Sequence, residues 1–236
     1  RPVTLELVTS ARTLADSLGG SVTLAVLGSA VDAVAQAAAQ VSGVDAVVTA
    51  SDPGLDPFTG PAWTAAVTQA VEQVAPAVLI GGATTAGRDY MPRVAARIGT
   101  GHASDAVEVS VEDGKVVALR PVLESRVQSA VAFEGDGIAT LTMRPGSTAR
   151  AEASGGSAEV RSIEISLSDA DLAVKAEAPV APEGSASSQA MSTAERIVAG
   201  GRGLGAPDKF ALVEELAAEL SAAVAATRPL SDAGWR

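Results

Sequence analysis

Apolar residues follow two alternating patterns along the first hundred residues. In residues 3–18, valine, leucine and alanine recur with the spacing of an amphipathic helix, whereas residues 21–27 form a short apolar run between glycines, typical of a buried strand. The alternation continues, with helices expected at 30–41, 61–74 and 89–98 and strands at 45–49 and 77–81. Strands separated by helices predict a parallel sheet covered on both faces.

The pattern changes between residues 103 and 167, where shorter strand-like segments are joined by turns. The sequences E-D-G-K at 112–115 and E-G-D-G at 134–137 contain Asp-Gly pairs, which are typical of hairpin turns. Strands are expected at 107–111, 116–123, 129–133, 138–143 and 160–167. We therefore expect antiparallel strands added to the parallel core.

A stretch rich in proline and serine, residues 168–192, is typical of a linker. Within it we place the domain boundary. The prediction is an N-terminal α/β domain at 1–178, a linker at 179–192 and a second domain at 193–236.

The composition excludes several classes of function. The chain of 236 residues has a formal net charge of −11 and no visible basic patch, which argues against nucleic-acid binding. It has no cysteine, so disulfides, thiolate metal sites and cysteine nucleophiles are excluded, which suits a reducing cytoplasm. No signal peptide and no apolar run of about eighteen residues is visible, so no segment is expected to insert into a membrane.

The segment R-I-V-A-G-G-R-G-L-G at residues 196–205 carries the most specific local signal. A short apolar strand runs into glycines, and Pro207 and Asp208 then begin a helix expected to reach Leu220. Such a strand, turn and helix N-terminus favour an anion, because backbone N–H groups converge and glycines let a phosphate approach. Arg202, between two glycines, offers planar contact with a phosphate or a flavin.

The same segment departs from the dinucleotide-binding fingerprint. Its spacing is not G-x-G-x-x-G, and the next apolar run, residues 222–227, ends in Thr-Arg where that fingerprint has an acidic residue. A loop in which the glycines serve only tight-turn geometry is the alternative interpretation.

Other polar residues are interpreted structurally. His102, the only histidine, follows a predicted helix end without a catalytic partner at recognisable spacing, so we interpret it as a capping or surface residue. Asp89 is interpreted as a helix cap beside the exposed Arg88 and Arg93, with a contact to a partner subunit as the alternative.

The remaining acidic and aromatic residues give no functional signal. Five aspartates are expected to bond backbone amides in turns or at strand starts: Asp52, Asp56, Asp105, Asp113 and Asp136. Asp169 and Asp171 are interpreted as solvated residues. Trp63 and Trp235 fit either core or interface positions.

Longer stretches resemble one known family. The sequences A-E-R-I-V-A-G-G-R-G-L-G at 194–205, F-A-L-V-E-E-L-A-A-E-L at 210–220 and A-A-V-A-A-T-R-P-L-S-D-A-G-W at 222–235 closely resemble the start of the FAD domain of electron transfer flavoprotein alpha subunits. G-A-T-T-A-G-R-D-Y-M-P-R-V-A-A-R-I-G at 82–99 is similar to a stretch late in the family's N-terminal domain. The resemblance covers essentially the whole chain, but the chain covers only part of the family.

The resemblance implies a fold and a cofactor. The expected fold is a parallel sheet flanked by helices with added antiparallel strands, of the nucleotide alpha hydrolase-like kind, followed by the start of a Rossmann-like FAD domain. Family members begin with a strand before the helix at Pro2 and continue after D-A-G-W with further flavin-binding motifs. We therefore expect the sequence to be clipped at both ends and to hold only part of an FAD site.

The resemblance also assigns residues to the flavin. The arginine of G-G-R-G lies against the FAD in proteins that this one resembles, which gives that role to Arg202, flanked by Gly201 and Gly203. The family usually has a Ser-Arg pair before its D-A-G motif, and Thr227 and Arg228 occupy those positions here. Threonine keeps the hydroxyl group, whereas its methyl group and the following proline depart from the common pattern.

The function implied is that of an electron carrier with bound FAD, not an enzyme. Such a carrier pairs with a beta subunit, which holds AMP, and takes electrons from acyl-CoA dehydrogenases of fatty acid beta-oxidation or from other flavoenzymes. It passes them to a membrane quinone oxidoreductase, and a bacterial cytoplasmic location is expected. Two alternatives stay open. One is an NAD(P)-dependent oxidoreductase whose nucleotide-binding half begins at Arg196, with Arg228 on a 2′-phosphate; the other is a non-catalytic α/β scaffold.

Overall fold

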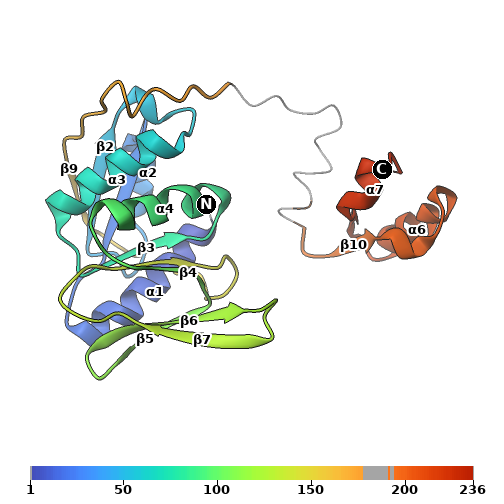
Figure 1. The fold of residues 1–236 in the computed structure, drawn as a ribbon, viewed down its shortest axis with the longest axis horizontal. Coiled ribbons are helices and arrows are strands. Elements are labelled where there is room, and N and C mark those ends of the chain that lie inside the picture. The colour runs from blue at the N-terminus through green and yellow to red at the C-terminus, as the bar shows by residue number, and fades with distance from the viewer. Residues whose placement is uncertain (1, 178–190, 192–193, 236) are drawn as a thin grey trace. The chain divides into compact units, whose positions relative to one another are not determined.

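The computed structural model describes residues 2–177, 191 and 194–235 (Figure 1). Contacts divide the chain into two compact units, Arg1–Glu177 and Ala178–Arg236. Most of the expected linker, residues 179–192, lies outside the described residues. No helix among the described residues is both long and apolar enough to cross a membrane.

The first unit begins with the predicted alternation of helices and strands, which is confirmed. Its elements are α1 (Pro2–Leu18), β1 (Thr23–Gly28), α2 (Asp32–Ala39), β2 (Ala46–Ser51), α3 (Gly60–Val74), β3 (Val78–Gly82) and α4 (Thr85–Arg97). Helix α4 begins four residues before the predicted start, because Thr84 caps it: the Thr84 hydroxyl accepts the Gly87 N–H at 3.2 Å. The prediction that Asp89 is the cap is therefore wrong.

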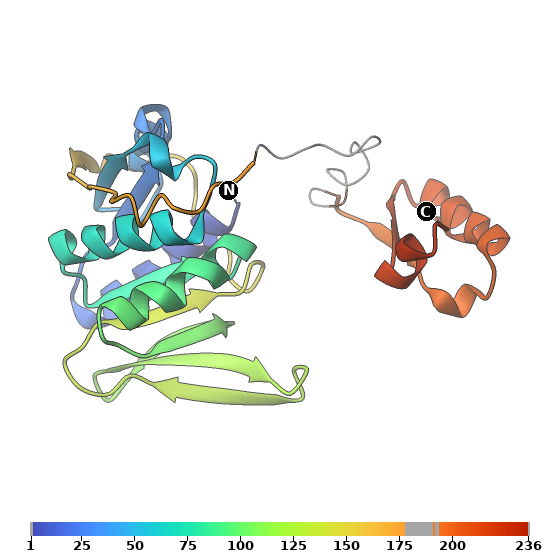
Figure 2. The same cartoon turned by 45° about the horizontal axis from the view of Figure 1, so that its top comes forward.

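The next strands extend both the parallel and the antiparallel parts of the unit (Figures 1 and 2). They are β4 (His102–Ala106), β5 (Glu108–Glu112), β6 (Lys115–Val122), β7 (Val127–Ala132), β8 (Ala139–Met143) and β9 (Glu159–Ser162). Strands β5, β6 and β7 form an antiparallel sheet, as predicted. Its first turn has left-handed φ values of 50° at Asp113 and 77° at Gly114, as the Asp-Gly pair predicts.

Two predicted antiparallel strands instead join parallel sheets. Strand β8 lies between β3 and β4 and is parallel to both, and β9 is parallel to β2. Every residue of β8 is buried, so this strand has covered faces on both sides, as strands of parallel sheets do. The prediction that 138–143 and 160–167 add to the antiparallel part is wrong, and β4 was not predicted as a strand.

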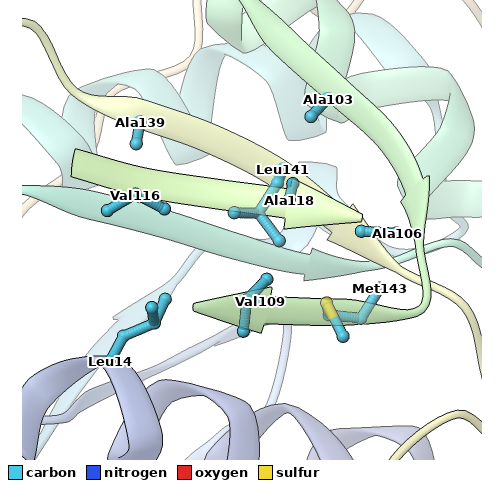
Figure 3. Packing of buried hydrophobic residues seen from close by; sticks show 9 residues of the cluster. All are labelled: Leu14, Ala103, Ala106, Val109, Val116, Ala118, Ala139, Leu141 and Met143. Atoms are coloured by element: carbon cyan, nitrogen blue, oxygen red, sulfur yellow. The ribbon is translucent and has the colours of Figure 1, made fainter. Parts of the chain in front are cut away.

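One buried cluster connects helix α1, the β3-β8-β4 sheet and the antiparallel sheet (Figure 3). Leu14 of α1 packs with Val109 of β5, Leu141 and Met143 of β8, and small residues of β4 and β6. Helix α4 packs against the same sheet through contacts with β4 and β8. The first unit is thus an α/β structure of parallel sheets flanked by helices, with a small antiparallel sheet.

The second unit is a small α/β structure. It contains β10 (Ile197–Gly200), two short 3-10 turns at Arg202–Leu204 and Pro207–Phe210, α6 (Ala211–Glu219), β11 (Ala223–Ala226) and α7 (Arg228–Asp232). Strands β10 and β11 are parallel. Phe210, Val213 and Leu230 form the buried cluster, and Trp235 packs against it, so this tryptophan belongs to the core of the second unit.

Candidate functional site

The candidate site lies where β10 and β11 end. Because the strands are parallel and in register, with Gly200 opposite Ala226, the residues that follow them meet at one edge of the sheet. The Thr227 N–H donates to Gly200 O at 2.9 Å and closes this edge. The structure therefore places Gly201 and Thr227 next to each other although they are far apart in sequence.

The glycines of this turn serve different purposes. A Cβ on Gly200 would lie 2.6 Å from Cε2 of Phe210, and Gly205 has a left-handed φ of 84°, so packing and backbone conformation require these two glycines. A Cβ on Gly201 would lie at ordinary contact distance, 3.6 Å, from Cγ2 of Thr227, and one on Gly203 would meet nothing within 4 Å among the described residues. Packing thus explains Gly200 and turn geometry explains Gly205, whereas Gly201 and Gly203 lie on an open edge.

Two arginines flank the same edge. Arg202 follows Gly201 in the 3-10 turn and is exposed, and no ion pair is found for it among the described residues. Arg228 begins α7, where Pro229 is tolerated because the N–H of the first turn needs no partner within the helix. The Arg228 side chain is 91% exposed and lies 3.5 Å from the Asp232 carboxylate one turn later. This acidic neighbour was not identified from the sequence.

The groups at this edge are of the kinds found in nucleotide cofactor sites. Thr227 presents its side chain beside Gly201, at a contact distance of 3.7 Å from the position of an added Cβ, and two cations lie in the adjoining turns. Backbone without side chains, a hydroxyl group and two guanidinium groups are the groups that contact phosphates and aromatic rings in cofactor sites.

The aspartates of the first unit divide into two groups. Asp52 accepts the Gly54 N–H at 2.8 Å, as predicted for a turn residue. Asp105, in contrast, has a left-handed φ of 61° and accepts hydrogen bonds from Arg144 at 2.7 Å and Arg88 at 3.1 Å. The hydrogen bond and charge of Arg144, helped by Arg88, hold the pKa of Asp105 below its usual range. The prediction of backbone capping for Asp105 is therefore wrong.

Two other residues, Asp171 and Trp63, make more specific contacts than predicted. Asp171 accepts from the hydroxyl and N–H of Ser168 and lies 3.5 Å from Arg97, and these contacts lower its pKa. It is therefore not simply a solvated residue. Trp63 donates to Leu55 O at 3.0 Å and contacts two other aromatic rings, so it is an anchor within the first unit.

His102 is not a capping or surface residue, because it begins strand β4 and is half-buried. The Thr140 hydroxyl donates its proton to Gly101 O at 2.7 Å, so it can only accept from His102 Nδ1, which lies at 3.2 Å. Burial, and then the charge of Arg120, lower the pKa of His102. No group of three histidine, cysteine or acidic side chains that could hold a metal is present among the described residues.

Comparison with known proteins identifies two family segments. Residues 1–168 match the electron transfer flavoprotein domain, and residues 190–236 match the electron transfer flavoprotein FAD-binding domain. The second match assigns the segment around the glycine-rich turn to a flavin-binding domain, of which this chain contains part.

Individual relatives align along the whole chain. The chain is 34% identical to the electron transfer flavoprotein subunit alpha of Bacillus subtilis, over all of this chain and 70% of that protein. It is 32% identical to the subunit alpha of Megasphaera elsdenii, again over 100% of this chain and 70% of the relative. It is 34% identical to the protein FixB of Clostridium saccharobutylicum over 99% of this chain and 69% of that one. The chain belongs to the electron transfer flavoprotein alpha-subunit family.

Proposed function

We propose that this protein carries electrons through an FAD bound in part at the edge formed by Gly201 and Thr227. In this proposal the second unit is the start of a Rossmann-like FAD-binding domain, the first is a nucleotide alpha hydrolase-like domain, and residues 179–192 link them. The observation that carries the proposal is that Gly201 and Gly203, unlike Gly200 and Gly205, have no steric or conformational reason to be glycine within the described residues.

Each residue of the edge has a distinct role in this proposal. Gly201 and Gly203 let a cofactor approach the backbone, Thr227 offers a hydroxyl group, and Arg202 offers a planar guanidinium for bidentate or stacking contact. FAD supplies the electron chemistry when it is bound. Arg228 supplies positive charge that favours the negative charge added on reduction, and Asp232 offsets part of that charge at 3.5 Å.

The proposed cellular role follows the family. The chain pairs with a homologous beta subunit, which holds AMP. The flavin accepts electrons from acyl-CoA dehydrogenases or other flavoenzymes in the bacterial cytoplasm, and a membrane quinone oxidoreductase receives them. The relatives named above support the family on which this role rests.

The role of Arg228 is tested by Arg228→Ala in the flavin-loaded protein of the relatives' full length, together with its beta subunit. We expect a lower reduction potential, because loss of a nearby cation disfavours added negative charge. A loss of about 1.4 kcal/mol of electrostatic support corresponds to roughly 60 mV for a one-electron couple. Redox titration measures the shift, and Arg228→Lys is expected to recover part of it through charge alone.

Arg196→Ala is the matched control. It removes the same charge at the opposite edge of the second unit, before β10, where Arg196 Nη1 donates to Leu220 O. This variant is expected to leave the potential within a few millivolts of the parent protein, on the order of the error of a titration. An unchanged potential in Arg228→Ala, with FAD retained, would show that Arg228 has only a structural role.

A further inference from the structure

Strand β7 forms an unpaired edge of the first unit. The antiparallel sheet has the order β5-β6-β7, so within the described part of the chain β7 pairs only with β6. Both ribbon views show β7 as the outermost strand of this unit (Figures 1 and 2). Its outer edge therefore carries backbone hydrogen-bonding groups without a strand partner.

The hydrogen-bond pattern shows which groups these are. The Phe133 N–H donates to Val116 O on β6 at 3.0 Å. Backbone groups of an antiparallel pair alternate in direction, so Val127, Ser129 and Val131 also bond toward β6. The N–H and C=O groups of Gln128, Ala130 and Ala132 consequently point to the outer edge.

This edge lacks the features that usually protect an exposed strand. Natural edge strands carry charged residues, prolines or bulges that block pairing with another chain. The sequence of β7, V-Q-S-A-V-A, has no charged residue and no proline, and its pairing with β6 is regular. Charges occur only beyond its two ends, at Arg126 and Glu134.

We propose that β7 pairs antiparallel with β7 of a second copy of this chain, around a twofold axis at Ala130. Only this axis pairs all three outward-facing residues, because it sets Ala130 opposite itself and Gln128 opposite Ala132. The same axis sets Arg126 opposite Glu134 of the other copy. Because of the twofold symmetry, two such pairs form, one at each end of the paired strands. The inference goes beyond the proposed function and does not depend on it.

The charged side chains are available for this pairing. The Arg126 side chain is 80% exposed, and its contact with Glu124 within the chain is long, at 3.9 Å. The Glu134 side chain is 70% exposed, although its carboxylate lies 2.8 Å from Nζ of Lys115. Pairing joins two three-stranded sheets into one six-stranded sheet, with opposite charges at both ends of the new strand pair.

Charge reversal tests the register. In the full chain, Arg126→Glu and Glu134→Arg each place like charges opposite one another at both ends, so each is expected to weaken self-association roughly tenfold. A mixture of the two variants restores opposite charges at both ends and is expected to associate as well as the parent chain. Glu108→Arg, on the opposite edge strand β5, is the control and is expected to change nothing. Sedimentation velocity over a concentration series measures association, and circular dichroism confirms folding.

A cross-link tests the axis independently. The chain has no cysteine, so Ala130→Cys introduces a single thiol. Residues opposite each other in a hydrogen-bonded antiparallel pair have Cα atoms about 5.5 Å apart, which a disulfide can span. Oxidation is expected to link this variant into a dimer, whereas Gln128→Cys, whose opposite residue is an alanine, is expected not to cross-link.

Three results would overturn the proposal. The first is a full chain that stays monomeric at about 100 µM, roughly the range of weak protein association. The second is association that ignores both charge reversals, and the third is a dimer in which Gln128→Cys cross-links as well as Ala130→Cys. If a beta-type subunit displaces the second copy and protects Ala130→Cys from oxidation, the edge belongs to that subunit and self-pairing is wrong.

Discussion

At the scale of single residues, His102 links hydrogen bonding to pH. Its Nδ1 must carry a proton to donate to Thr140, and it lies near the positive charge of Arg120. Burial and this charge both disfavour a second proton on the ring. The folded state therefore prefers a neutral histidine at this position.

This preference predicts that the first unit loses stability in mild acid. Because the pKa of His102 is lower in the folded state, the unfolded chain binds more protons as the pH falls below about 6.5, and the free energy of unfolding decreases with it. His102→Gln keeps a donor for Thr140 and cannot titrate. Its free energy of unfolding should therefore change less than that of the parent protein between about pH 7.5 and 5.5, roughly the range in which histidine titrates. Urea unfolding at the two pH values checks this. An equal loss in both proteins would remove His102 as the cause.

Residue-scale interactions were the hardest to predict from the sequence. The aspartate at 52 bonds within its own turn, so its role was predictable from neighbouring residues. Asp105 instead pairs with Arg88 and Arg144, which are 17 and 39 positions away, and only the fold brings them together. The same holds for the contact between Thr227 and Gly201.

At the scale of elements, the glycine-rich turn contains two kinds of glycine that one experiment can separate. Gly200→Ala places a Cβ against Phe210, 2.6 Å away, and against Val213 and Leu204. Such overpacking is expected to cost about 1–3 kcal/mol of stability of the second unit. Gly203→Ala meets nothing within 4 Å and is expected to stay within about 0.5 kcal/mol of the parent.

Tryptophan fluorescence measures this difference in a Trp63→Phe background, where Trp235 reports on the second unit alone. In the flavin-loaded protein, Gly203→Ala is expected to weaken FAD retention despite its normal stability. Equal stability of the two alanine variants would contradict the packing argument. Unchanged FAD retention in Gly203→Ala would contradict the open-edge argument.

The sequence predicted most elements but not how all of them pair. Short apolar runs predicted β1, β2 and β3 because strands covered on both faces leave few polar positions. Strand β8 reads I-A-T-L-T-M with its preceding residue, so Thr140 and Thr142 alternate with apolar residues, and the segment was predicted to add to the antiparallel strands. Both threonines are buried, and their hydroxyls bond to Gly101 O and the Asp105 N–H. Buried hydroxyls with such partners cannot be distinguished from exposed ones by pattern alone.

At the scale of the whole molecule, the fold class followed from periodicity, whereas the cofactor followed from family resemblance. The local glycine pattern alone left a tight turn and an anion site equally open. The resemblance around residues 194–235 decided between them, and the match of residues 190–236 to a FAD-binding domain supports that decision. The unpaired edge of β7 required the structure, because a strand's position within its sheet is not encoded in its own residues.

The last prediction concerns how much of the cofactor site these 236 residues hold. They span about 70% of the relatives' length and match only part of the FAD-binding domain. In the second unit the side chains of Ile197, Leu212 and Leu216 are about half exposed, so its sheet and helix leave apolar surface uncovered within the described residues. The two strands and two α-helices described in this unit provide one edge for a ligand, whereas cofactor sites bury most of the ligand surface.

We therefore expect the 236-residue chain, expressed alone, to lose FAD on desalting. A chain of the relatives' full length, expressed with a beta subunit, is expected to retain about one FAD per protein, because additional surface then encloses the cofactor. Visible absorbance of the desalted proteins, normalised to protein concentration, makes the comparison. Arg202→Ala in the longer chain distinguishes FAD bound by specific contacts from FAD that is only enclosed by the protein. This variant should lower FAD retention without changing the protein yield. Stoichiometric flavin on the 236-residue chain would mean that the cofactor is held by residues other than those proposed at the edge of β10 and β11.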